Sequence, residues 1–121
     1  MQDNAIATEA TIPIERATTR LSGVPEVDVE WLRSVLGQVR LVDVRGADEL
    51  RGPLPAIPGS EHVPLGELLD AAESWDRQQP LVIVCRSGVR SARAALVLEE
   101  MGFSRVASLA GGVLDWHRCD D

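Results

Sequence analysis

The hydrophobic and polar positions of this chain change their period several times along its length, and each change predicts an element. After Asp28, a residue suited to capping a helix, apolar residues recur at helical spacing until Gly37. Residues 81–84, LVIV, form an unbroken apolar run with β-branched side chains, as a strand buried on both faces requires. Similar patterns predict helices over residues 29–36, 47–50, 65–75, 91–101 and 113–118, and strands over residues 40–45, 81–84 and 105–109.

The order of these elements predicts the fold class. Strands that alternate with helices form a mostly parallel sheet with helices on both faces, so we expect an α/β fold of three layers. Four of the seven prolines lie between residues 53 and 64, which predicts a loop over residues 51–59. Residues 1–24 are polar, rich in threonine and without a clear period. They predict a partly disordered N-terminal extension, followed by a single folded domain over residues 25–121.

Composition narrows the functional classes. The 121 residues are 45% hydrophobic and 26% charged, which is typical of one folded domain. The net charge of −7 argues against nucleic acid and against an anionic membrane as partners, since both favour a basic surface. The chain has no apolar run of bilayer-spanning length and no secretory signal pattern, so a cytoplasmic location is predicted. Cys85 and Cys119 belong to no zinc-type cluster, and we expect no structural disulfide, no metal and no other cofactor.

Cys85 has the sequence context of a reactive cysteine. It follows the buried strand directly and precedes a helix, and ligands of parallel sheets bind beyond the carboxyl ends of the strands. Backbone N–H groups at a helix start have no partner within the helix, and Gly88 allows a tight turn that aims them at an anion. Arg86 and Arg90 add positive charge. Such settings lower a cysteine pKa below its ordinary value of about 8.5, which predicts a thiolate nucleophile.

A cysteine at the end of an apolar strand is more often a small core residue. The nucleophile is the better interpretation here because glycine, two arginines and a helix start follow Cys85 in that order.

Residues 85–91, CRSGVRS, resemble the active-site loop of single-domain rhodaneses, whose usual pattern is Cys-Arg-x-Gly-x-Arg/Thr-Ser. Residues 41–45 (LVDVR) and 57–64 (IPGSEHVP) resemble two further motifs of that family, and residues 101–116 resemble its C-terminal signature. The resemblance covers residues 27–118 and implies the rhodanese-like fold. The chain departs from the family at Pro55-Ala56, where Gly-His is common.

The resemblance implies a sulfurtransferase. Cys85 would take sulfane sulfur from thiosulfate or a similar small anionic donor, hold it as a persulfide, and pass it to cyanide or to a thiol, including a protein thiol. The substrate-binding residues would be those of the loop, whose backbone N–H groups would hold the outer sulfur: Arg86, Ser87, Gly88, Val89, Arg90 and Ser91.

Two alternatives remain. Cysteine phosphatases and arsenate reductases use Cys-x5-Arg, whereas only four residues separate Cys85 from Arg90 here. A non-catalytic rhodanese-like module that binds a partner or carries sulfur is the other alternative.

Among the remaining polar residues, Asp43 and Arg45 share one face of a strand and predict a structural ion pair. His62 is expected in a structural turn.

Overall fold

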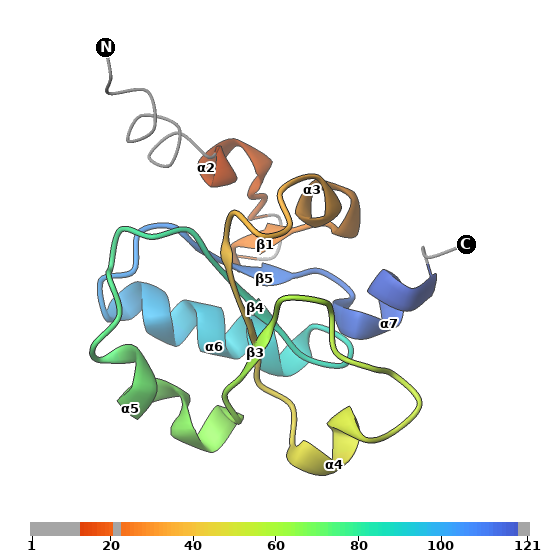
Figure 1. Ribbon diagram of the computed structural model, residues 1–121. Helices are drawn as coiled ribbons and strands as arrows, with labels where there is room; N and C mark the ends of the chain where they lie inside the picture. Colours follow the sequence, from red (N-terminus) through yellow and green to blue (C-terminus); the bar gives the residue numbers. More distant parts are fainter. Residues whose placement is uncertain (1–12, 21–22, 119–121) are drawn as a thin grey trace.

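The computed structural model describes residues 13–20 and 23–118. Its five strands form one parallel sheet in the order β1-β5-β4-β2-β3 (Figure 1). The strands are β1 (Glu26–Val27), β2 (Arg40–Asp43), β3 (Glu61–His62), β4 (Leu81–Val84) and β5 (Val106–Leu109). The helices are α2 (Ile14–Ala17), α3 (Val29–Ser34), α4 (Ala47–Leu50), the 3-10 helix η1 (Leu65–Glu67), α5 (Leu68–Ala72), α6 (Val89–Glu100) and α7 (Gly112–Arg118). None of the helices in these ranges is long and apolar enough to cross a bilayer.

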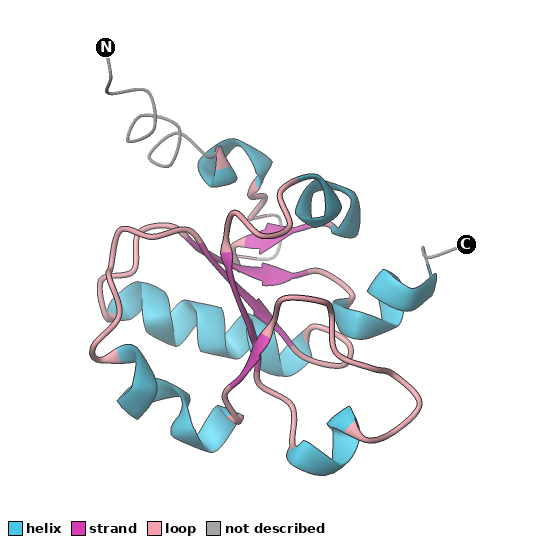
Figure 2. Ribbon diagram, in the orientation of Figure 1, coloured by secondary structure: helices cyan, strands magenta, loops and turns pink. Residues whose placement is uncertain are grey.

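Helices cover both faces of the sheet, so the predicted three-layer α/β fold is confirmed (Figure 2). Strand β4 shows the cause, because its four buried side chains alternate between two cores. Val82 and Val84 pack with α2, α3 and α7, whereas Leu81 and Ile83 pack with α5 and α6. The unbroken apolar run therefore supplies both cores at once.

Several predicted elements coincide with observed ones. Strand 81–84 and helix 47–50 have the predicted bounds. Asp28 caps α3, and its side chain accepts a hydrogen bond from the Trp31 backbone N–H at 2.8 Å.

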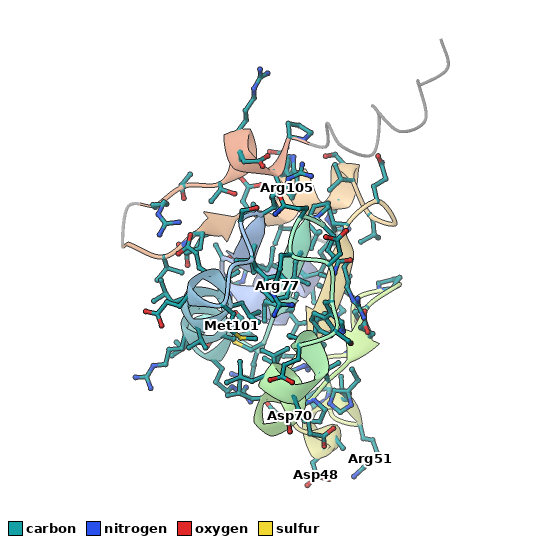
Figure 3. The ribbon with its side chains drawn as sticks, turned by 90° about the vertical axis from the view of Figure 1, so that its left-hand side faces the viewer. Asp48, Arg51, Asp70, Arg77, Met101 and Arg105 are labelled. Atoms are coloured by element: carbon teal, nitrogen blue, oxygen red, sulfur yellow. The ribbon has the colours of Figure 1, made fainter. Side chains whose placement is uncertain are left out.

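The predicted helix over residues 65–75 is wrong in length. It begins as the 3-10 turn η1 after Pro64 and ends as α-helix at Ala72. Its end is fixed from outside the segment, because Arg77 donates hydrogen bonds to the backbone carbonyls of Ala72, Glu73 and Trp75. Figure 3 shows Arg77 close to Met101, whose carbonyl it also contacts at 3.2 Å.

The predicted helix 91–101 begins two residues too late, since α6 starts at Val89. Gly88 precedes it with a φ of 103°, a left-handed conformation that favours glycine. The segment between β4 and α6 is therefore only residues 85–88.

Three elements escaped prediction: α2, β1 and β3. Within the predicted extension, residues 13–20 pack on the domain, while residues 1–12 lie outside the described part. Ile14, the first residue of α2, is buried in the core. Arg20 pairs with Glu99 of α6 at 2.7 Å, and Glu15 pairs with Arg105 at 2.8 Å.

Candidate active site

Cys85 is the first residue after β4 and lies at the carboxyl edge of the sheet. Its side chain belongs to the core under α6, and the residue is 1% exposed. Arg86 and Ser87, which follow it, are exposed. The thiol therefore lies beneath a short loop whose outer surface faces solvent.

Backbone N–H groups point at the Cys85 sulfur. The amides of Gly88 and Ser91 donate to Sγ, with N···S distances of 3.1 and 3.4 Å. Burial raises the pKa of the thiol, but hydrogen bonds from the Ser91 side chain and from the amides of Ser91, Gly88 and Ser87 outweigh burial and lower the pKa below its ordinary value. Amides of the predicted nest therefore donate to the sulfur, and the pKa of the thiol is lowered.

Helix α7 holds the loop in this orientation. The N–H groups of Val113 and Leu114 donate to the carbonyls of Cys85 and Arg86, each at 3.0 Å. In a trans peptide the C=O and the following N–H point in opposite directions. Because the Arg86 carbonyl faces α7, the Ser87 amide faces the sulfur.

Two glycines allow this close approach. A Cβ on Gly112 would clash with the carbonyl oxygens of Cys85 and Arg86. A Cβ on Gly88 would lie 3.2 Å from the Gly111 nitrogen. The loop is therefore enclosed between the start of α6 and the turn that begins α7.

The two arginines of the loop differ in their partners. Arg90 binds Glu49 of α4 through two hydrogen bonds of 2.7 and 2.8 Å. The Arg90 guanidinium, helped by the Gly46 amide, lowers the pKa of Glu49 to about 2, and Glu49 in turn raises the pKa of Arg90. Arg86 is exposed and forms no ion pair within residues 13–20 and 23–118. Arg86 is therefore the uncompensated cation of the loop.

The Ser91 hydroxyl has a buried partner. Its Oγ lies 2.6 Å from Oγ of Ser108 on β5, and both residues are fully buried. Ser91 therefore hydrogen-bonds to the thiol from the buried side of the loop. Val89 is 63% exposed to solvent. Contact of the loop residues with a substrate stays a prediction.

A hollow adjoins the loop on the side of α4. It is lined by Arg45, Asp48, Glu49, Gly52, Pro53, Leu54 and Arg86. The predicted ion pair between Asp43 and Arg45 is confirmed, at 2.9 Å and fully buried. Arg45 also donates to the Leu54 carbonyl at 2.8 Å.

Two histidine contacts complete this wall. His62 contacts the Arg45 carbonyl and His117 contacts the Pro55 carbonyl, each through Nε2 at 2.7 Å. Arg45 and His117 thus contact the proline-rich loop directly, and His62 contacts the backbone of Arg45.

Three contributors to the site were not identified from the sequence. Glu49 neutralises Arg90, Ser108 supports Ser91, and Gly112 admits the loop backbone. Two of them left a signal: Gly112 belongs to a predicted Gly-Gly turn, and Ser108 is a polar residue within a predicted buried strand. Glu49 gave none, because it lies 41 residues from Arg90.

Comparisons with known proteins find similar sequences and a similar fold. A family model described as a rhodanese-like domain matches residues 28–119. The thiosulfate sulfurtransferase GlpE of Pseudomonas savastanoi pv. phaseolicola is 37% identical over 98 residues, which cover 81% of this chain and 89% of that protein. The putative sulfur carrier protein YrkF of Bacillus subtilis is 30% identical over 105 residues; the match covers 84% of this chain but only 56% of that protein. The structure of the human single-domain sulfurtransferase TSTD1 superimposes with a TM-score of 0.67 at 28% identity, covering 82% of this chain and all of that one.

Proposed function

The chain belongs to the rhodanese-like domain family, and on this basis we propose that it is a sulfurtransferase that carries sulfane sulfur on Cys85. One observation supports this proposal above the others: the amides of Gly88 and Ser91 donate to the Cys85 sulfur at the carboxyl edge of the sheet. A cysteine that only filled the core would need no such donors, because a buried thiol is a weak acceptor.

In the first half-reaction, the Cys85 thiolate attacks the outer sulfur of a donor such as thiosulfate. A new S–S bond forms, the S–S bond of thiosulfate breaks, and sulfite leaves with the bonding electrons. Cys85 then carries a persulfide whose terminal sulfur is negative. The amides that now donate to Sγ, with those of the loop residues 86–90, stabilise this charge as an oxyanion hole does.

In the second half-reaction, cyanide or a thiolate attacks the terminal sulfur of the persulfide. The S–S bond breaks and the Cys85 thiolate leaves, which its lowered pKa favours. Cyanide leaves as thiocyanate, and a thiol leaves as a persulfide. Because the two substrates react in turn with one covalent intermediate, the kinetics are ping-pong.

Arg86 is the residue we assign to attract the donor. It is the uncompensated cation of the loop and it lines the hollow beside α4. The charge of Arg90 is already met by Glu49, so Arg90 serves to attach α6 to α4. The name of the Pseudomonas relative points to thiosulfate as the donor, and we propose the same class of small anion here.

The proposal is tested by loading the protein with sulfur and weighing it. After treatment with thiosulfate, the wild type should gain about 32 Da, the mass of one sulfur on a single nucleophile. Cys85→Ala should gain nothing, and Cys119→Ser, which alters the second cysteine of the chain, should load as the wild type does. An adduct retained by Cys85→Ala would place the sulfur elsewhere and contradict the proposal.

The same preparations separate the two alternatives. Hydrolysis of an aryl phosphate without any discharge of thiosulfate would indicate a phosphatase instead. A protein that loads sulfur but does not turn over with cyanide or a thiol would be a sulfur carrier. A protein that neither loads sulfur nor hydrolyses phosphate would leave the partner-binding module as the remaining alternative.

A further inference from the structure

An apolar groove lies between η1, α5 and α6, on the side of the molecule where Figure 1 shows α5 beside α6. Its lining residues are Leu65, Leu68, Leu69, Arg93, Ala94 and Val97, and we call it the α5–α6 groove. Leu65 is 41% exposed, Leu69 46% and Val97 39%, so three large apolar side chains of the groove meet solvent. Such a cluster is typical of a binding surface, whereas single exposed apolar residues are common.

The α6 wall of the groove leads towards the Cys85 loop. Helix α6 begins with Val89, which is 63% exposed, and the exposed Arg93 and Val97 follow at intervals of four residues on the same side of the helix. With a helical rise of about 1.5 Å per residue, Val97 lies about 12 Å along α6 from Val89. A segment lying in the groove therefore has one end near the loop above Cys85.

The charge around α6 indicates what kind of segment fits. Residues 85–98 contain three arginines and no acidic residue, in a chain with a net charge of −7. Arg90 is bound by Glu49, but Arg86 and Arg93 form no ion pair within the described part of the chain. The exposed acids Glu67 and Asp70 belong to η1 and α5, the elements of the opposite wall, so the unpaired positive charge of this region lies on the α6 side.

We propose that the α5–α6 groove docks the sulfur-accepting partner: a protein segment that carries a cysteine, apolar anchors and acidic side chains. This inference rests on the proposed sulfurtransferase function. The apolar anchors occupy the groove, the acids pair with Arg86 and Arg93, and the cysteine reaches the persulfide at the loop.

Two other occupants fit less well. A second copy of the chain carries the same net charge of −7, so repulsion between the two copies disfavours a dimer at the groove. An anionic membrane would meet the positive edge of α6 but would be repelled by a chain of net charge −7.

The distance sets the spacing of a probe peptide. An extended chain spans about 3.3–3.6 Å per residue, so about three or four residues bridge the 12 Å between the far end of the groove and the loop. The acidic probe is a peptide with one cysteine, a Leu-Leu pair four residues away, and two glutamates between them. The first control peptide has lysines for the glutamates, the second has serines for the leucines, and the third has the leucines next to the cysteine. Dithiothreitol serves as the small-thiol acceptor.

The measurement is kcat/KM for sulfur transfer from the persulfide-loaded full chain to each acceptor. We expect the acidic probe to react at least about tenfold faster than each control peptide, as burial of two apolar side chains and a paired charge predicts. The double variant Leu69→Ser/Val97→Ser should lose this advantage while its rate with dithiothreitol stays unchanged. Leu96→Ser, on the same helix but outside the lining residues and 37% exposed, is the matched control and should behave as the wild type does.

A charge reversal gives a gain of function. Arg93→Glu should slow the acidic probe and speed the lysine peptide. Arg16→Glu changes an exposed arginine of α2 and should alter neither rate.

Equal rates for all four peptides, or no effect of the groove variants, would overturn the inference while the proposed function stands. Groove-dependent binding to phosphatidylserine vesicles, or a dimer abolished by Leu69→Ser/Val97→Ser, would overturn it in favour of those occupants. Failure to load sulfur or to discharge it to dithiothreitol would instead reject the proposed function.

Discussion

At the scale of single residues, the pKa of Cys85 depends on opposing effects of its surroundings. Burial favours the neutral thiol, and hydrogen bonds from Ser91, Gly88 and Ser87 favour the thiolate and prevail. The attacking species is the thiolate. With a lowered pKa, sulfur loading should therefore stay fast as the pH falls below the ordinary thiol value, and should decline only when the pH passes the lowered one.

Replacing Ser91 by alanine tests this balance. Ser91→Ala removes the hydroxyl but keeps the backbone amide, so the pKa of Cys85 should rise towards its ordinary value. We expect the loading rate near neutral pH to fall by about tenfold, because one hydrogen bond to a charged group is lost. The pH–rate profile for loading, or for alkylation by iodoacetamide, should move to higher pH.

Ser108→Ala is the matched control. It removes the partner of the Ser91 hydroxyl but leaves the hydroxyl itself near the sulfur. Its profile should move less than that of Ser91→Ala. Identical profiles for Ser91→Ala and the wild type would mean that the amides alone set the pKa.

At the scale of elements, the site is a loop held from two sides. Helix α6 supplies the amides of its first turn, and α7 binds the carbonyls of Cys85 and Arg86. Gly112 begins α7 at the point of contact and has a φ of 59°. The orientation of the amides thus depends on a helix that contributes no side chain to the sulfur.

Gly112→Ala should disturb both stability and sulfur loading. Its Cβ would overlap the carbonyls of Cys85 and Arg86, and the left-handed backbone adds strain. We expect a loss of about 2–5 kcal/mol in the free energy of unfolding, measured with urea, and a loading rate lower by at least about tenfold. Gly59→Ala is the control, because Gly59 also has a positive φ but nothing within 4 Å of its Cβ position. It should cost only about 1–2 kcal/mol and load sulfur normally.

Element bounds were predicted well where local residues set them. Strand β4 and the cap of α3 follow from local residues, the LVIV run and Asp28, and both were predicted. The end of α5 depends on Arg77, and the start of α6 on the left-handed Gly88. Neither residue changes the hydrophobic pattern of the sequence, so the predicted bounds of both helices were wrong. Strands β1 and β3 are two residues long, too short for any alternation to appear.

At the scale of the whole molecule, the three-layer fold was predictable because helices and strands have different hydrophobic periods along the chain. The position of Cys85 at a strand end was predictable from the apolar run that precedes it. The side-chain contacts that support the site could not be predicted, because they join distant parts of the chain. Glu49 and Arg90 are 41 residues apart, and Ser91 and Ser108 are 17 apart. Such pairs form only when the elements pack.

The N-terminal segment is another feature that only packing defines. Residues 13–20 have little periodicity, yet they are fixed to the domain at three points: the buried Ile14, the Glu15–Arg105 ion pair and the Arg20–Glu99 ion pair. Ion pairs on a surface contribute little to stability, about 0–1 kcal/mol each. Ile14 should therefore supply most of the attachment.

Ile14→Ala tests whether this segment is part of the cooperative fold. Ile14 is 1% exposed and packs in the same core as α3 and α7, so truncation leaves a cavity that the neighbouring side chains cannot fill. We expect urea unfolding to show a loss of about 2–5 kcal/mol, in a single transition. Arg16→Ala, an exposed neighbour on α2, should change stability by less than about 0.5 kcal/mol. If the two variants were equally stable, the segment would be a detachable arm, and the folded unit would begin after it.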